Sequence, residues 1–169
     1  MRTLLAAGVA LALGACASMD GRGLQPGQST VADVRAVMGE PAETRAGEGG
    51  EIVYWYPRLP YGRQSYAARI DPAGKLVALE QRLTEENIAK VVRGETTMQE
   101  VRDLLGPPFE PTKFARMERE VWTYPMRIAG DLNPKWFIVQ MSPDGVVRET
   151  YLMDDPQFQP KDTPFRRFP

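Results

Sequence analysis

The fold class that the sequence predicts is α+β, with two tandem units that each pack one or two short helices on a three-stranded antiparallel sheet. Three observations predict it. A helix signature occurs twice, at 26–41 and at 94–108. Each copy is followed by a short aromatic strand. Two apolar runs then surround a turn that contains proline and glycine, which predicts a hairpin at 65–82 and another at 135–153.

Both copies of the signature predict a short helix with a defined start and end. Thr30 and Thr97 are candidate N-caps, and the acids three residues later, Asp33 and Glu100, resemble the second half of a capping box. Apolar residues recur every three or four positions and predict one buried stripe on each helix. A glycine follows each helix where a left-handed residue is expected, and a proline lies just beyond it.

The first strand of each unit is predicted at 52–56 and at 120–124, where aromatic and β-branched residues run up to a proline. Trp55 and Trp122 fall at the same distance after the two helices, so we expect them at equivalent core positions. The sheets of the two units are expected to lie side by side or to join edge to edge.

The chain divides into five segments. A further short helix is expected at 84–92, with Thr84 as its cap, and it opens the second unit. The predicted order is a signal peptide at 1–15, a tether at 16–25, a first unit at 26–83, a second unit at 84–155 and a proline-rich tail at 156–169.

The composition excludes most catalytic chemistry. The chain has no histidine and one cysteine, which removes histidine-based triads, dyads and metal sites, and disulfides within the chain. With a net charge of −1, the chain lacks the excess of positive charge that is typical of a nucleic-acid-binding protein. Acid pairs such as Glu85-Glu86 are adjacent and do not face each other across a cleft. We therefore expect no enzyme, no cofactor and no metal site; a carboxylate-only active site is the one catalytic route left open.

The N-terminus has the pattern of an export signal. Met1-Arg2 is followed by an apolar run at 4–13, which has the length of a signal-peptide core. The sequence Leu13-Gly14-Ala15-Cys16 then resembles the lipobox of bacterial lipoproteins. That resemblance implies cleavage before Cys16, its lipidation by more than one acyl chain, and a stable membrane anchor. Because no aspartate follows Cys16 directly, it also implies the periplasmic face of the bacterial outer membrane.

The repeated motif, Gly-x-Ser/Thr-Thr followed by a helix that ends in Gly-x-Pro, resembles the SmpA/OmlA (BamE-like) family over about 24–153. That resemblance implies a lipid-anchored periplasmic scaffold, an accessory factor in outer-membrane β-barrel assembly or envelope integrity. The tandem layout is also similar to the secreted β-lactamase inhibitor proteins. This alternative implies an inhibitor or binding module for a periplasmic enzyme.

Loops and the tail supply the candidate partner-binding residues, because aromatic, arginine and apolar side chains gather there. The partner is expected to be a protein. The candidates are Arg58, Tyr61 and Arg63 in the loop after the first strand, Arg127 and Ile128 in its longer counterpart, and Phe165 and Phe168 in the tail.

Overall fold

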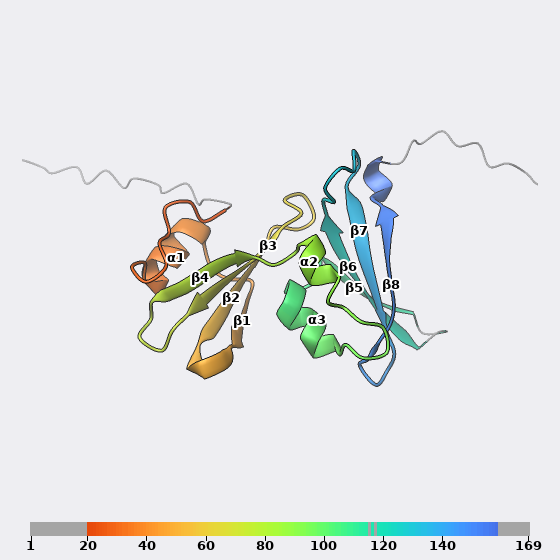
Figure 1. The fold of residues 1–169 in the computed structure, drawn as a ribbon, viewed down its shortest axis with the longest axis horizontal. Helices are drawn as coiled ribbons and strands as arrows, with labels where there is room; N and C mark the ends of the chain where they lie inside the picture. Colours follow the sequence, from red (N-terminus) through yellow and green to blue (C-terminus); the bar gives the residue numbers. More distant parts are fainter. Residues whose placement is uncertain (1–19, 115, 117, 159–169) are drawn as a thin grey trace, which may run out of the picture.

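The computed structural model describes residues 20–114, 116 and 118–158, which form two separate four-stranded antiparallel sheets (Figure 1). The predicted signal peptide, the lipidation site at Cys16 and the phenylalanines of the tail lie outside these residues. Across the described part of the chain, no helix has the length and apolar character to cross a membrane.

Each unit contributes one sheet with a simple meander order. Sheet 1 belongs to the first unit, whose elements are α1 (Val31–Met38), β1 (Glu43–Ala46), a 3₁₀ turn η1 (Glu48–Gly50), β2 (Ile52–Pro57), β3 (Ser65–Ile70) and β4 (Leu76–Gln81). Sheet 2 belongs to the second unit, with α2 (Glu85–Ile88), α3 (Met98–Leu105), β5 (Glu110–Phe114), β6 (Arg119–Met126), β7 (Lys135–Met141), β8 (Val147–Asp154) and a 3₁₀ turn η2 (Pro156–Phe158).

The α+β class and the two tandem units are confirmed, but each sheet has one strand more than expected. The extra strands are the edge strands β1 and β5, with sequences ETRA and EPTKF. They are polar and lack the apolar alternation that marks a half-buried strand. Their pairing with β2 and β6 is a tertiary feature. The second predicted helix is also shorter than expected, since α2 covers four residues.

The predicted helix starts are confirmed by a complete capping box at both α1 and α3. At α1, the Thr30 hydroxyl accepts from the Asp33 backbone N–H, and the Asp33 carboxylate accepts from the Thr30 backbone N–H at 2.7 Å. This backbone hydrogen bond is the main reason that the pKa of Asp33 is lowered. Gly39 and Gly106 end the helices with φ of 84° and 81°, but with ψ of −168° and −167°. They are extended residues in a region that essentially only glycine occupies, and they are not in the left-handed helical region.

The expected equivalence of Trp55 and Trp122 is wrong by one residue. Trp55 pairs with Glu43 across β1 and β2, whereas the residue in that place in sheet 2 is Thr123, which pairs with Glu110. A shift of one residue moves a side chain to the other face of a sheet. Trp122 therefore faces the helix of its own unit, while Trp55 faces away from α1.

The contacts of Arg35 in α1 and Arg102 in α3 agree with this shift of one residue. The Arg35 guanidinium lies 5.4 Å from the centroid of the Tyr54 ring, and that of Arg102 lies 5.5 Å from the Trp122 ring. Because α1 and α3 match residue for residue, Tyr54 and Trp122 occupy equivalent strand positions.

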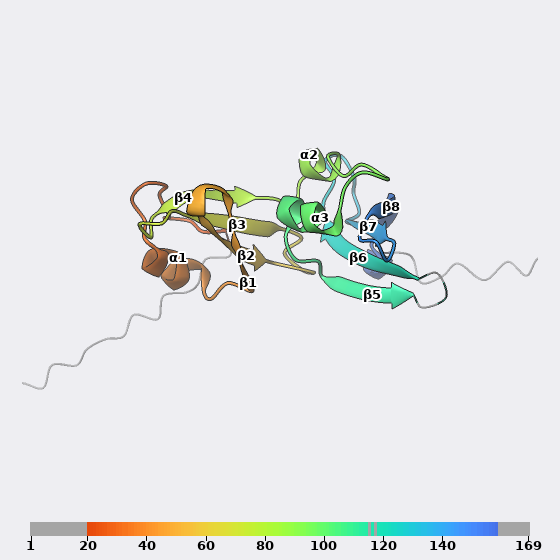
Figure 2. The same ribbon diagram turned by 90° about the horizontal axis from the view of Figure 1, so that it is seen from below.

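The elements stack in the order α1, sheet 1, α3, sheet 2. Val34 and Met38 of α1 pack on one face of sheet 1, and Val101 and Leu105 of α3 pack on sheet 2. Figures 1 and 2 show α3 between the two sheets, so that it also approaches the free face of sheet 1. The sheets are thus separate and do not join edge to edge, because a helix lies between them.

Candidate interaction surfaces

A close contact between the units joins Gly106 and Trp55. A Cβ added at Gly106 would lie 2.5 Å from Cε3 of Trp55 and 2.7 Å from Oγ of Ser65. Trp55 is only 2% exposed. At the equivalent Gly39, an added Cβ would meet no atom within 4 Å. Gly106 therefore does more than end its helix, because its missing side chain lets α3 rest on the indole of the other unit.

Arginine side chains also link the two units at this contact, which we call the junction. Arg102 of α3 forms an ion pair with Glu43 of β1, with 3.2 Å between Nε and Oε1. The hydrogen bond from Arg102 is the largest cause of the lowered pKa of Glu43. Arg82 donates to the carbonyls of Leu104 and Asp103 at 3.2 and 3.1 Å. These are carbonyls at the end of α3 that lack partners within the helix.

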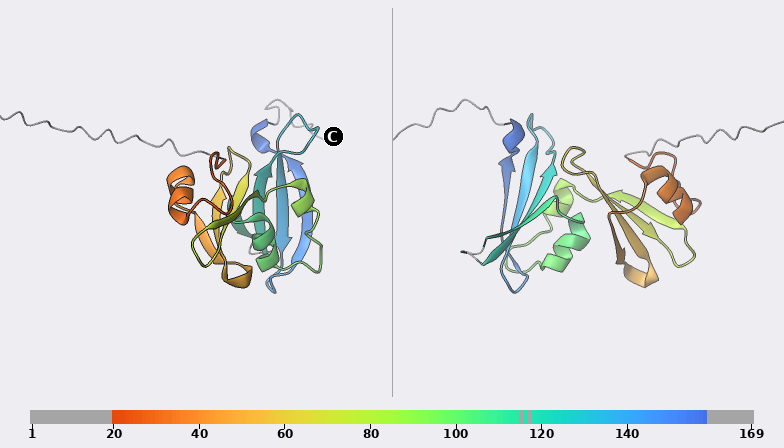
Figure 3. Two further views of the ribbon diagram at one scale, coloured as in Figure 1. Left: turned by 60° about the vertical axis from the view of Figure 1, so that its left-hand side comes forward. Right: turned by 180° about the vertical axis from the view of Figure 1, so that it is seen from behind.

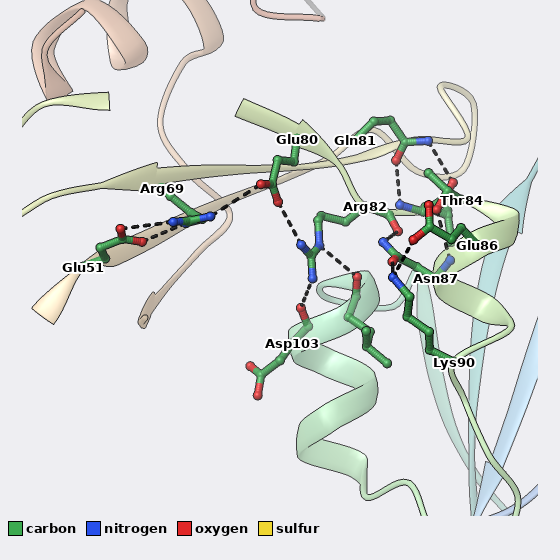
Figure 4. A network of polar contacts seen from close by, with 12 residues as sticks. Glu51, Arg69, Glu80, Gln81, Arg82, Thr84, Glu86, Asn87, Lys90 and Asp103 are labelled. Carbon is green, nitrogen blue, oxygen red and sulfur yellow. Dashed lines mark hydrogen bonds and ion pairs between the residues drawn. The ribbon is translucent and has the colours of Figure 1, made fainter. Parts of the chain in front are cut away.

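A pocket of about 540 Å³ remains where α3 does not cover sheet 1. Val53, Trp55 and Ala67 line it, together with charged residues of β3, β4 and α3. Figure 4 shows Arg69 bound to Glu51 and Glu80, and Arg82 bound to Glu80. The third arginine that lines the pocket, Arg45, pairs with Glu43 and Asp103. The charges of the pocket arginines are thus neutralised by acids of the same chain. This network of ion pairs stabilises the contact between the two units.

The segment that links the units is also held by side chains. Gln81 accepts from the Leu83 N–H and donates to the Leu83 carbonyl, at 2.6 and 2.8 Å. Asn87 of α2, which is buried, donates to the Arg82 carbonyl at 2.7 Å (Figure 4). The hydroxyl of Thr84 accepts from the Asn87 N–H, so the predicted cap is confirmed. The link is therefore an ordered part of the junction.

A second, buried ion pair also joins the two units. Arg63, in the loop between β2 and β3, lies 2.9 Å from Asp155, whose side chain is 2% exposed. The same guanidinium lies 5.2 Å from the centroid of the Phe158 ring. Leu59 of this loop packs against the core of the second unit. The loop after β2 thus docks on the neighbouring unit.

The face of sheet 2 that points away from α3 is not covered by any helix of the described residues (Figures 2 and 3). We call it the open face. Strand pairing places on it Glu110, Thr112 and Phe114 of β5, Arg119, Val121, Thr123 and Pro125 of β6, Trp136, Ile138 and Gln140 of β7, and Glu149, Tyr151 and Met153 of β8.

The open face is apolar at its centre, with a charge pair at one end. Phe114 and Tyr151 are 46% and 41% exposed, while Val121 and Ile138 between them are buried. Arg119 lies 3.7 Å from Glu149, so these charges are paired. A buried apolar centre flanked by exposed aromatic side chains, with polar groups at the rim, is a common composition of a protein–protein interface.

The predicted partner-binding residues do not gather on one surface. Tyr61 is 81% exposed at a loop tip, and Arg127 is also exposed. Arg63 is held by the ion pair described above, and Ile128 packs against the core of the second unit. Arg58 donates to the carbonyl at the end of α1 and lies 5.7 Å from the centroid of the Tyr56 ring. Phe165 and Phe168 lie outside the described residues, and a partner role for all seven stays a prediction.

Sequence reasoning missed the open face because it depends on the strand register. With Trp122 aligned to Trp55, the two faces of β6 could not be assigned correctly. The available signal was the alternation of Val121 and Thr123 with Trp122 and Tyr124, which puts the two aromatics on one face and leaves the other to smaller side chains.

No protein-family model matches the chain, and no curated protein matches it. Two solved structures resemble it. One is a DUF4309 family protein (YjgB) from Bacillus subtilis, 18% identical, with 79% of this chain and 84% of that chain covered and a TM-score of 0.30. The other is described as a "putative beta-lactamase inhibitor protein" from Streptococcus mutans, 13% identical, with coverages of 82% and 90% and a TM-score of 0.30. At these values the likeness assigns no function.

The prediction of tandem SmpA/OmlA (BamE-like) units was wrong. No family model supports it, and the similar structures are a DUF4309 protein and an inhibitor-like protein. The repeated motif on which it rested consists of a capping box, an apolar stripe and a terminal glycine. These features describe a short helix on a sheet, which is a general solution in small α+β units, so they do not identify a family. The expected role in β-barrel assembly falls with this resemblance.

Proposed function

We propose that this protein is a non-catalytic binding module that contacts a protein partner through the open face of sheet 2. The observation that carries the proposal is a sheet face with exposed aromatic side chains that no described helix covers, on a unit whose other face packs against α2, α3 and the linking segment. Exposed aromatic side chains over a buried apolar centre are common anchors of protein interfaces. The partner that fits is a folded protein with an apolar protrusion, since the centre of this face is apolar and Arg119 and Glu149 pair with each other.

The acids of the pocket beside sheet 1 and α3 also favour a binding role over catalysis. Glu51 and Glu80 are both engaged by Arg69. The hydrogen bond from Arg69 lowers the pKa of Glu51, which keeps this carboxylate ionised at neutral pH. A general acid needs a pKa near the working pH, so paired acids of this kind are poor proton donors.

We further propose that the module is held at the periplasmic face of the outer membrane by lipid on Cys16. The lipobox-like sequence that ends at Cys16 supports this, together with the positive and apolar segments before it. In that compartment the partner would be an envelope protein such as a periplasmic enzyme.

A photo-crosslinking experiment tests the open face. Benzoylphenylalanine is introduced at Thr112, which lies on the exposed β5 edge of the open face, in the full chain expressed in cells of its own organism. The matched control carries it at Val77, an exposed position of sheet 1. We expect a discrete crosslinked protein from Thr112 and none from Val77. Equal yields from both positions, or no product from Thr112, would overturn the proposal.

The inhibitor form of the proposal has its own test. The purified chain is titrated against a periplasmic β-lactamase and a cell-wall hydrolase, and residual activity is measured. Saturable inhibition that is lost in Tyr151→Ala but kept in Val77→Ala supports an inhibitor. Full activity at saturating chain, with a crosslink still formed from Thr112, identifies a binding module that leaves its partner active.

A further inference from the structure

Two loop tips carry the most exposed large apolar side chains of the described residues. Leu132, in the loop between β6 and β7, is 97% exposed, and Tyr61, in the loop between β2 and β3, is 81% exposed. The next most exposed side chain of this kind among the described residues is Phe158, at 47%. One exposed apolar residue is ordinary on a protein surface. The meaning of these two therefore depends on where the loops lie relative to each other.

Contacts between the units hold the two loops at one end of the molecule. Arg63 donates to the Tyr61 carbonyl at 3.2 Å and pairs with Asp155. The Asp155 N–H donates in turn to the carbonyl of Pro134, in the loop that carries Leu132, at 3.0 Å. Figures 1 and 3 show both loops at the same end. The loops are thus fixed by backbone and ion-pair contacts, while the two apolar side chains at their tips project into solvent.

The described chain begins at this same end. Burial raises the pKa of Tyr66, the second residue of β3, and the Asp20 carboxylate adds to this effect, so Asp20 lies near the β2–β3 end of sheet 1 (Figure 1). Cys16 precedes Asp20 by four residues. Because an extended chain spans at most about 3.6 Å per residue, Cys16 lies within about 14 Å of Asp20. A lipid on Cys16 is therefore attached at the end of the molecule that carries the two tips.

The geometry points to a lipid bilayer as the surface that Tyr61 and Leu132 contact. This inference rests on the proposed lipid at Cys16, because that anchor brings the two tips to the membrane. Tyrosine suits the interfacial region, since its ring is apolar while its hydroxyl reaches water and headgroups. The leucine side chain meets the boundary of the acyl chains. The apolar area buried in this way adds to the binding that the lipid anchor supplies.

The charges around the tips favour apolar contact over attraction to anionic lipid. Arg63 is engaged by Asp155, and Lys135 is engaged by Asp131 and Asp154. Binding to anionic lipid uses clusters of lysine and arginine whose charge is directed at the membrane. The contact therefore forms on zwitterionic lipid, and it persists at high salt because little of it is electrostatic.

This contact sets how the protein stands on the membrane. The turns at 71–74 and 142–145 join the strand ends opposite to the two loops, so they point away from the bilayer. The strands of sheet 2 run away from the membrane surface (Figure 1). The open face is then turned sideways, where a soluble partner can reach it.

Fluorescence quenching in vesicles tests the contact. The full, lipid-modified chain receives one new cysteine for a fluorophore, in Tyr61→Cys, Leu132→Cys or the matched control Ala73→Cys, which lies at an exposed position of the 71–74 turn. Each variant is reconstituted in phosphatidylethanolamine–phosphatidylcholine vesicles, with or without nitroxide groups on the acyl chains. We expect the nitroxide lipid to quench both loop labels, at low and at high salt, and to leave the turn label unchanged.

The parent chain separates this inference from the proposed anchor. It is treated with the same fluorophore, because a lipidated Cys16 has no free thiol, and its flotation with vesicles reports the anchor. A parent that takes up the label and does not float removes the anchor and this inference with it. A parent that floats, while the loop labels respond in the same way as the turn label, overturns this inference alone.

A charge on one tip should weaken the contact at the other. In the Tyr61→Cys chain, Leu132→Asp should reduce quenching of the label, since a carboxylate is costly to place among acyl chains. The matched control Val77→Asp, at an exposed apolar position beside the 71–74 turn, should leave the quenching unchanged. Equal quenching in both chains would overturn a joint contact of the two tips, because the fluorophore would then enter the lipid without Leu132.

Discussion

Gly106 ends α3 on the indole of Trp55, a side chain of the other unit, with no room between them for a methyl group. The same glycine is present at the end of α1, where it faces open space. The two equivalent glycines therefore have different structural roles. Gly39 ends α1, whereas Gly106 ends α3 and also allows this helix to pack against sheet 1.

Replacing each glycine by alanine should reveal this difference. Gly39→Ala is expected to cost about 1–3 kcal/mol, because alanine is forced into a glycine-only backbone region. Gly106→Ala should cost about 1–3 kcal/mol more, since its Cβ overlaps Trp55. Urea unfolding of both variants at neutral pH measures the two losses. Equal losses would show that the indole moves away at little cost.

The two tyrosines at equivalent strand positions, Tyr56 and Tyr124, should respond in opposite ways to loss of the hydroxyl. The Tyr124 hydroxyl donates to the Gly106 carbonyl at 3.0 Å, so Tyr124→Phe should cost about 1 kcal/mol. The Tyr56 hydroxyl is buried with no hydrogen-bond partner in the described residues, and burial raises its pKa to about 12. Tyr56→Phe should therefore be neutral or stabilising. Calorimetric unfolding of the two variants measures both changes in stability. An equal loss of stability in Tyr56→Phe and Tyr124→Phe would contradict the prediction.

The Glu43–Arg102 pair predicts a pH dependence of the junction. Because the folded pKa of Glu43 is lowered, its contribution is complete above the ordinary value of 4.5 and is lost as the pH falls through the folded pKa. Glu43→Gln should therefore cost about 1 kcal/mol at neutral pH, and the difference from the parent should shrink in acid. The matched control is Glu40→Gln, in an exposed pair with Arg35. Urea midpoints from neutral to acid pH report both; a pH-independent difference at Glu43 would argue against this coupling.

Removing Asp155 should be the most damaging loss of a single charge. Arg63 would be left inside the junction without its partner, at an expected cost of about 3–5 kcal/mol in Asp155→Ala. Replacing both partners, with Arg63→Met and Asp155→Leu, should recover much of that loss. The control Asp131→Ala, in a more exposed pair with Lys135, should cost under about 1 kcal/mol. A double-mutant cycle in urea measures the coupling, and additive single losses would rule it out.

Local signals in the sequence were enough to predict the parts of the fold that local chemistry determines. Thr30 and Thr97 cap their helices as expected, because a capping box involves residues only three positions apart. The prolines and glycines at 71–74 and 142–145 form the predicted hairpin turns for the same reason. The class and the tandem organisation follow from these elements.

Contacts between residues that are far apart in the sequence could not be predicted from local signals. Glu43 meets Arg102, and Arg63 meets Asp155, only after both sheets have formed. The polar edge strands β1 and β5 show no hydrophobic periodicity that would predict a strand. The identity of Trp55 and Trp122 was itself misleading, since one additional residue between β5 and β6 puts the two indoles on opposite faces. The open face could be assigned only once that register was known.

Thr123 makes the free face of sheet 2 unlike that of sheet 1. In a solenoid, each repeat must offer the next one a seat for its helix. Sheet 1 offers Trp55, but sheet 2 has Thr123 at that position, so it gives a third α3-like helix no indole to rest on. The free face of sheet 2 therefore lacks the indole against which α3 packs on sheet 1, and an α3-like helix would need Thr123→Trp to pack there in the same way.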